Sequence, residues 1–231
     1  MTDETPRIEV TIAAPIDAVW RALREPQQIR HWHGWDDPGL EAEIQLIYLD
    51  EDKIQASEAD HTLEVQGGDL FELTDLGGST RLRLTRAPRG SNPEWEAYYD
   101  DITEGWTTFV HQLRFALERH PGDARRTLFF MGTPRDRGTQ ITSLEPAEAP
   151  TTLTGSEWFR SQNQVGHTVK EWGDGLLVLG DAPVSATKPN GGAMAVLSTY
   201  GLDENAFEDL RARWTDWWAA RYEPDSPPTS P

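Results

Sequence analysis

The chain has no cysteine and far fewer basic than acidic residues. Its 231 residues include 21 Lys and Arg against 39 Asp and Glu, which gives a formal net charge of −18 and a sequence pI of about 4.6. Without cysteine there is no disulfide framework, no thiolate nucleophile and no cysteine metal site, and a reducing cytoplasm fits this composition. The negative charge opposes phosphate neutralisation, so we expect neither nucleic acid nor an anionic membrane surface as a partner.

Long apolar runs and nucleotide-binding motifs are missing as well. No run approaches the roughly 20 residues of a membrane span, and the opening MTDETPRIEV lacks the basic start and apolar core of an export signal. The chain contains no P-loop, no G-x-G-x-x-G that opens a helix, no H-E-x-x-H and no G-x-S-x-G. We therefore expect a cytoplasmic protein that does not span a membrane and carries no cofactor.

Periodicity predicts the elements of the first half. Alternation of Ile8, Val10 and Ile12 with polar residues predicts a half-buried strand. The following APIDAVWRALREP and QQIRHW predict two short helices. Four alternating runs, EAEIQLIYL, HTLEVQ, DLFELTDL and TRLRLTRA, predict an antiparallel meander with glycine turns. A long helix is expected over 96–118, with Trp106, Phe109 and Leu113 on its apolar face.

This order of elements carries a resemblance to a known family. The opening IEVTIAAPIDAVWRALREPQQIRHW and the later YYDDITEGWTTFVHQLRFAL occur in the order found in the START-like (SRPBCC) superfamily. The chain resembles in particular the branch of activators of the 90-kDa heat-shock chaperone ATPase. The resemblance implies an α+β helix-grip fold, in which an antiparallel sheet wraps around a long C-terminal helix and leaves an apolar cavity between them. Fold alone does not fix function in this superfamily.

The second half looks like a reduced repeat of the first. DITEGWTTFV at 101–110 aligns with DLRARWTDWW at 209–218, so that Trp106 matches Trp214. RRTLFFMG predicts a first strand, whereas the helical insert after it looks eroded. We expect a START-like domain at 1–119, a degenerate second START-like domain at 125–222 and a disordered, proline-rich tail at 223–231.

The densest cluster of reactive side chains is RHWHGWDD at 30–37. A His-x-His pair points both imidazoles to one face of an extended chain, so His31 and His33 invite a metal-site interpretation. A zinc site needs a third ligand on packed secondary structure, and the remaining histidines do not supply one. We therefore expect no metal and assign the stretch to the wall of the cavity.

The ligand-binding candidates are aromatic or apolar residues expected to face the cavity of the first domain. They are Trp20, Trp32, Trp35, Tyr48, Phe71, Tyr98, Tyr99, Trp106, Phe109 and Leu113. Tyr98 and Tyr99 also offer hydroxyl groups to a ligand. Asp100, Asp101 and Glu104 crowd the expected start of the long helix, where acids favour the helix dipole without any catalytic role. We assign no catalytic residue.

Three functions follow from these expectations. The leading hypothesis is non-enzymatic binding of a small hydrophobic or aromatic molecule. The second is an enzyme of the polyketide cyclase or aromatase kind, which a buried acid or histidine pointing into the cavity would favour. The third is a co-chaperone that stimulates a heat-shock ATPase, with the chaperone as its partner, as the resemblance implies.

Overall fold

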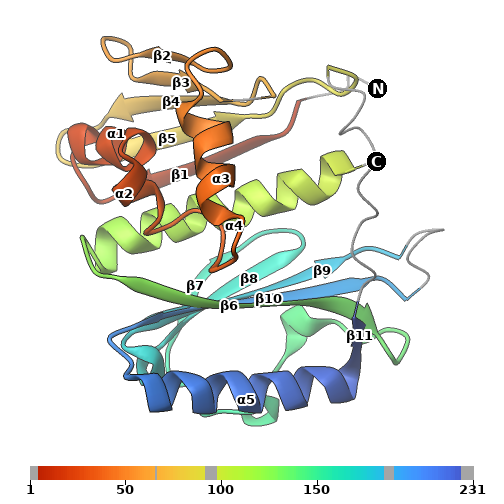
Figure 1. The fold of residues 1–231 in the computed structure, drawn as a ribbon. Coiled ribbons are helices and arrows are strands. Elements are labelled where there is room, and N and C mark those ends of the chain that lie inside the picture. The colour runs from red at the N-terminus through yellow and green to blue at the C-terminus, as the bar shows by residue number, and fades with distance from the viewer. Residues whose placement is uncertain (1–4, 66, 92–97, 185–189, 225–231) are drawn as a thin grey trace. The chain divides into compact units, whose positions relative to one another are not determined.

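The computed structural model describes residues 5–65, 67–91, 98–184 and 190–224. The chain divides into two compact units, Met1–Asp123 and Ala124–Pro231. Each unit has an α+β architecture, in which an antiparallel sheet is accompanied by one long helix (Figure 1). Within the described ranges, no helix is long and apolar enough to cross a membrane.

The first unit begins with a strand and two short helices, continues into further strands and ends in a long helix. Its helices and strands are β1 (Arg7–Ile12), α1 (Ile16–Arg24), α2 (Pro26–Ile29), α3 (Leu40–Ile44), the π-helix η1 (Gln45–Leu49), β2 (Gln55–Ser57), β3 (Thr62–Glu64), β4 (Leu70–Asp75), β5 (Thr80–Thr85) and α4 (Tyr99–Arg119). The strand order is β1-β5-β4-β3-β2, with every neighbouring pair antiparallel.

Alternation decides which face of this sheet is buried. Along β5, Thr80, Leu82 and Leu84 are buried while the residues between them are partly exposed. Figure 1 shows α4 lying along one face of the sheet. The buried face of α4 includes Trp106 and Leu113, which belong to the same hydrophobic core as the inward residues of β4 and β5. The sheet and α4 therefore share one core.

The expectation of a strand over EAEIQLIYL is wrong. This segment forms α3 and η1, and the meander begins instead with the short strand β2, which the sequence did not predict. Ile44 and Tyr48 are fully buried, whereas Leu46 is 42% exposed. Residues four apart share a helix face, so the burial of both Ile44 and Tyr48 fits a helix. In a strand, Leu46 would lie on the same face as Ile44 and Tyr48 and would be buried with them.

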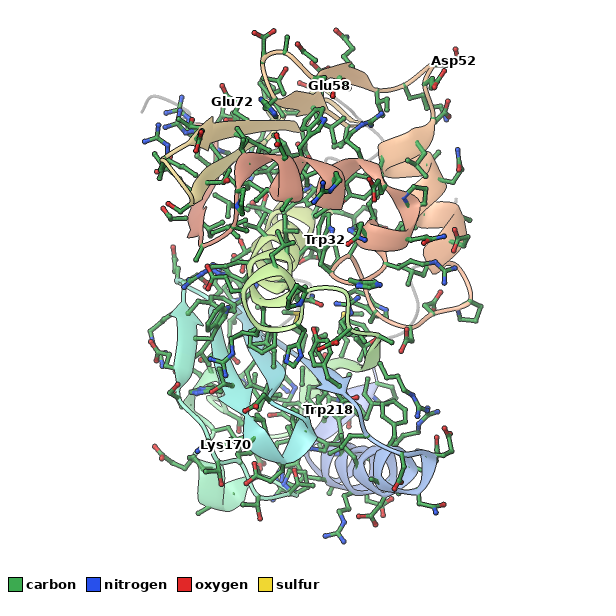
Figure 2. The ribbon with its side chains drawn as sticks, turned by 90° about the vertical axis from the view of Figure 1, so that its left-hand side faces the viewer. Trp32, Asp52, Glu58, Glu72, Lys170 and Trp218 are labelled. Carbon is green, nitrogen blue, oxygen red and sulfur yellow. The ribbon has the colours of Figure 1, made fainter. Side chains whose placement is uncertain are left out.

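The short helices enclose Trp32. This side chain is buried and donates its indole N–H to the carbonyl oxygen of Ala22 in α1 over 2.8 Å. Figure 2 shows Trp32 within the first unit, whereas Asp52 and Glu58 project from its outer edge. The expected long helix begins at Tyr99, three residues later than predicted, and residues 96 and 97 lie outside the described part of the chain.

The second unit repeats this strand order. Its helices and strands are β6 (Arg125–Pro134), the 3₁₀ turns η3 (Ile141–Ser143) and η4 (Pro146–Glu148), β7 (Glu157–Arg160), β8 (Gln164–Val169), the 3₁₀ turn η5 (Lys170–Trp172), β9 (Gly175–Ala182), β10 (Gly192–Tyr200), α5 (Glu204–Arg221) and β11 (Tyr222–Pro224). The order β6-β10-β9-β8-β7 corresponds to β1-β5-β4-β3-β2 of the first unit, with β11 added beside β6. The 3₁₀ turns η3 and η4 stand where the first unit has α1 and α2.

Aromatic side chains fill the region between α5 and its sheet. Trp214 is fully buried, and its ring lies 6.2 Å from that of Phe130 and 5.9 Å from that of Trp172. Trp218 stacks on Tyr222 with ring centroids 4.1 Å apart. Residues 223 and 224, expected in a disordered tail, pair with β6 as part of β11, and 225–231 lie outside the described residues.

Candidate functional site

A cavity of about 400 Å³ lies in the first unit. Its lining comes from the loop after α2, the α3–η1 helix, the loop before β4, the segment after β5 and the first half of α4. The lining residues are His33, Glu43, Leu46, Ile47, Gly67, Asp69, Arg86, Ala87, Pro88, Ser91, Tyr99, Ile102, Gly105, Trp106 and Phe109. The cavity is therefore built from segments that are far apart in the sequence.

Apolar side chains make up much of the cavity wall. The Phe109 ring lies 6.0 Å from the ring of Trp106, one turn earlier on α4, and 4.5 Å from the ring of His33. Ile47 and Leu46 contribute aliphatic surface from η1. Because Leu46 is also 42% exposed, it lies where the cavity meets solvent. A wall of this composition suits an aromatic or aliphatic molecule.

A buried ion pair occupies one part of the lining. Leu70 pairs with Thr85 at the end of the β4–β5 ladder, which brings Asp69 and Arg86 opposite each other just beyond it. Arg86 Nε lies 2.9 Å from Asp69 Oδ1, and the two side chains are only 5% and 7% exposed. Asp69 also accepts hydrogen bonds from the Ala87 backbone N–H at 2.8 Å and from Trp106 Nε1 at 2.6 Å. These bonds offset the desolvation of the carboxylate.

Arg86 also forms hydrogen bonds to the first turns of α4. Arg86 Nη1 donates to the carbonyl oxygen of Tyr99 at 3.2 Å and to Thr103 Oγ1 at 2.6 Å. The Tyr99 hydroxyl donates in turn to the Ala87 carbonyl oxygen at 2.7 Å. The guanidinium carbons of Arg86 and Arg89 lie 4.5 Å and 4.3 Å from the centre of the Tyr99 ring, within cation–π range. The end of β5 and the first turn of α4 are thus held together.

A second polar group in the lining is His33, which is fully buried. Its Nδ1 lies 2.9 Å from the Tyr48 hydroxyl, and its Nε2 lies 3.3 Å from Glu43 Oε1. Burial, and then the charges of Glu43 and Asp69, raise the pKa of Tyr48 well above its usual value. The phenol therefore keeps its proton and can donate it to Nδ1; the tautomer that accepts this bond carries its own proton on Nε2, which faces Glu43.

The structure distributes the ten sequence-predicted residues over different environments. Those in the cavity lining are Tyr99, Trp106 and Phe109. Those in the core and outside the lining are Trp32, Tyr48, Phe71 and Leu113. Trp20 and Trp35 are half-buried, and Tyr98 is 41% exposed. For two of these residues the structure shows why they do not line the cavity. The Tyr48 hydroxyl is directed at His33, and Tyr98 lies before the first turn of α4.

Sequence reasoning did not select Glu43, Asp69 and Arg86. It assigned the stretch that contains His33 to the cavity wall but gave this residue no binding role of its own. One signal pointed to Arg86, because it continues the inward series of β5 that starts at Thr80. Period-two alternation places such a residue on the buried face, where an arginine needs a partner. Asp69 extends the buried series of Phe71 and Leu73 in β4 in the same way, but the sequence does not show that it pairs with Arg86, 17 residues away.

The acidic cluster at the start of α4 lies outside the cavity lining. Asp100 is exposed and pairs with Arg89. Across the described ranges, no group of three or more His, Asp or Glu side chains is arranged to hold a metal ion. The acidic residues at the start of α4 therefore do not contribute to the cavity lining.

Comparison with known proteins gives distant structural neighbours. No protein-family profile and no curated protein sequence matches the chain. DynU16, a protein of the dynemicin biosynthetic locus, is 15% identical with a TM-score of 0.34, over 94% of this chain and 96% of its own. The di-domain ARO/CYC BexL, from the BE-7585A biosynthetic pathway, is 10% identical with a TM-score of 0.33, over 96% of this chain and 100% of its own. The di-domain ARO/CYC StfQ, from the steffimycin biosynthetic pathway, is 14% identical with a TM-score of 0.34, over 89% and 87%. These values are too low to assign an activity to this chain.

Proposed function

We propose that the first unit binds a small, largely apolar aromatic molecule in the cavity beneath α4. The observation that carries the proposal is the cavity itself, about 400 Å³ in volume, with the rings of Trp106 and Phe109 in its wall and a few polar groups among them. Volumes of roughly 300 to 1,000 Å³ with an apolar lining and a small number of placed polar groups are typical of small-molecule sites. The chain would then act as a binding protein.

Gly105 gives a way to test this without disturbing the core. It lies in the lining, on α4, and a Cβ atom added there would be 3.9 Å from the Phe109 ring, an ordinary contact. Gly105→Ala is therefore tolerated and favours the helix by roughly 1 kcal/mol. Gly105→Leu places a larger side chain in the cavity, so it removes ligand space from a position where a methyl group is harmless.

The experiment is a fluorescence titration with the neutral probe N-phenyl-1-naphthylamine. We expect saturable binding of one probe per chain to the wild type and to Gly105→Ala, and at least about 10-fold weaker binding to Gly105→Leu, which corresponds to roughly 1.4 kcal/mol. Circular dichroism establishes that both variants are folded. An absence of saturable binding to the wild type, or equal binding by all three proteins, would contradict the proposal.

A second candidate function is catalysis of the cyclase or aromatase kind, and His33 is the observation that favours it. This buried imidazole lines the cavity and shares a hydrogen bond with Glu43, a carboxylate that is itself 49% exposed. A carboxylate beside an imidazole can accept a proton from a bound molecule and return it. The test is deuterium incorporation from D₂O into the methyl group of an aromatic methyl ketone, followed by mass spectrometry. We expect Glu43→Gln to abolish any such exchange, while Glu41→Gln, on the same helix but outside the lining, retains it.

The co-chaperone alternative stays a prediction. No observation on the described surface of the first unit favours it over ligand binding.

A further inference from the structure

One guanidinium nitrogen of Arg86, Nη2, has no hydrogen-bond partner among the described residues. Its Nε donates to Asp69, and its Nη1 donates to the Tyr99 carbonyl and to Thr103. Nη2 makes no hydrogen bond to any residue that the structure describes. The residue is only 5% exposed and lines the cavity, so a molecule bound there meets this donor directly. Nη2 is not one of the fully buried polar atoms without a partner, so it is accessible from the cavity, and an acceptor on a bound molecule can form a hydrogen bond to a charged donor there, worth roughly 1.5 to 3 kcal/mol.

We propose that the ligand carries an oxygen acceptor that binds Arg86 Nη2, and that this oxygen belongs to a neutral carbonyl group on an aromatic framework. This inference rests on the proposed ligand-binding function and specifies the class of the ligand. An aromatic ketone meets both requirements: its rings contact Trp106 and Phe109, and its carbonyl oxygen accepts from the guanidinium. A pure hydrocarbon meets only the first requirement.

The charge balance of the cavity selects the neutral ligand over an acid. The charge of Arg86 is matched by Asp69, whose carboxylate already accepts three hydrogen bonds. Arg89, stacked on the same Tyr99 ring, is paired with Asp100. Glu43 adds a further acidic side chain to the lining, and the whole chain carries a net charge of −18. A bound carboxylate would therefore meet no uncompensated positive charge in a largely apolar cavity, which is unfavourable.

Asp69 acts in this scheme as a positioning residue. It fixes the guanidinium through Nε and the Trp106 indole through Nε1, so one carboxylate sets both the donor and an aromatic wall of the cavity. It does not itself need to contact the ligand. Neutralising Asp69 leaves the Arg86 charge without its partner, and this predicts a reversal of ligand preference rather than a simple loss of binding.

The test compares three naphthalenes of similar size on the wild-type chain, by displacement of N-phenyl-1-naphthylamine. They are 2-acetylnaphthalene, the hydrocarbon 2-isopropylnaphthalene and the acid 2-naphthoate. We expect the ketone to bind at least about 10-fold more tightly than the hydrocarbon, as a hydrogen bond to a charged donor implies, and the carboxylate to bind most weakly. The same series on Asp69→Asn should show 2-naphthoate binding more tightly than the ketone.

Each outcome separates this inference from the proposed function. Equal affinity for ketone and hydrocarbon would leave the binding function standing and overturn the Arg86 subsite. Tighter binding of 2-naphthoate than of the ketone by the wild type would overturn the neutral-ligand assignment. Failure of all three to displace the probe would overturn both proposals. Because the main comparison uses the wild-type chain, it does not depend on whether Asp69→Asn folds.

Discussion

The indole Nε1–H of Trp106 donates to Asp69 Oδ2 over 2.6 Å, and this bond joins the middle of α4 to the residue just before β4. Both side chains are about 95% buried. A charged hydrogen bond is stronger and more directional than the apolar contacts around it, so it adds a geometrically specific link between the helix and the sheet. The shape of the cavity between α4 and the strand ends therefore depends on this pair.

Replacing Trp106 with Phe should lower the free energy of unfolding by about 1.5 to 3 kcal/mol, because a buried carboxylate loses a hydrogen-bond donor. Trp20→Phe is the matched control: Trp20 is half-buried, and its indole makes no hydrogen bond to the residues that the structure describes. Urea unfolding followed by circular dichroism measures both. Equal losses in the two variants would mean that ring size, and not the bond to Asp69, determines the effect.

Gly173→Ala should destabilise the second unit strongly. Gly173 has a φ of 71°, and a Cβ atom there would lie 1.8 Å from the Tyr200 carbonyl oxygen. Gly201 has a similar φ of 63°, but a Cβ atom added there would meet nothing within 4 Å, so Gly201→Ala isolates the cost of the left-handed backbone, roughly 1 to 2 kcal/mol. Thermal unfolding should show the larger drop for Gly173→Ala, and matching drops would refute the predicted clash.

Tyr48 should make the stability of the first unit sensitive to alkaline pH. Burial, Glu43 and Asp69 raise the pKa of Tyr48 in the folded state above its usual value of 10.0. The folded chain thus holds this proton more tightly than the unfolded chain does, so the stabilisation is complete below pH 10 and declines as the pH rises above it.

Tyr48→Phe removes this titration together with the hydrogen bond to His33. We expect the variant to be about 1 kcal/mol less stable than the wild type at pH 8, with the difference narrowing above pH 10. Urea midpoints between pH 8 and pH 11 provide the measurement. If the stability difference between the wild type and Tyr48→Phe stayed constant from pH 8 to pH 11, the raised pKa of Tyr48 would be contradicted.

Leu46→Ser should weaken probe binding while leaving stability within about 0.5 kcal/mol, because Leu46 is 42% exposed and lies at the edge of the cavity. Leu76, which is 48% exposed and outside the cavity lining, supplies the control variant Leu76→Ser. Titration with N-phenyl-1-naphthylamine and thermal unfolding compare them. Unchanged affinity in Leu46→Ser would exclude this residue from the binding surface.

Strands with one buried face were predictable from the sequence, since Val10 and Ile12 of β1 and Leu82 and Leu84 of β5 are buried as their alternation required. The helical conformation of the α3–η1 segment was not predictable from its pattern, because the spacing of its apolar residues fits both a strand, with a period of two, and a helix. Its glutamate, alanine, glutamine and leucine content favours a helix, and tertiary burial of Ile44 and Tyr48 settles the choice.

Only the aromatic residues of the candidate site were predictable from the sequence. The helical period of α4 placed Trp106 and Phe109 on one face, and both line the cavity. The bonds from Asp69 to Arg86 and Trp106 span 17 and 37 residues, and no local pattern encodes such separations. A polar pair of this kind becomes visible only when the strand register brings its members together.

The short strand β2 has a consequence for association between chains. It forms one end of the five-stranded sheet and pairs over only three residues, Gln55–Ser57. Exposed edge strands offer unpaired backbone groups to which a strand of another molecule can add, and long, flat edges are the most vulnerable. An edge of three residues presents little backbone for such addition, so this side of the sheet resists growth into aggregates.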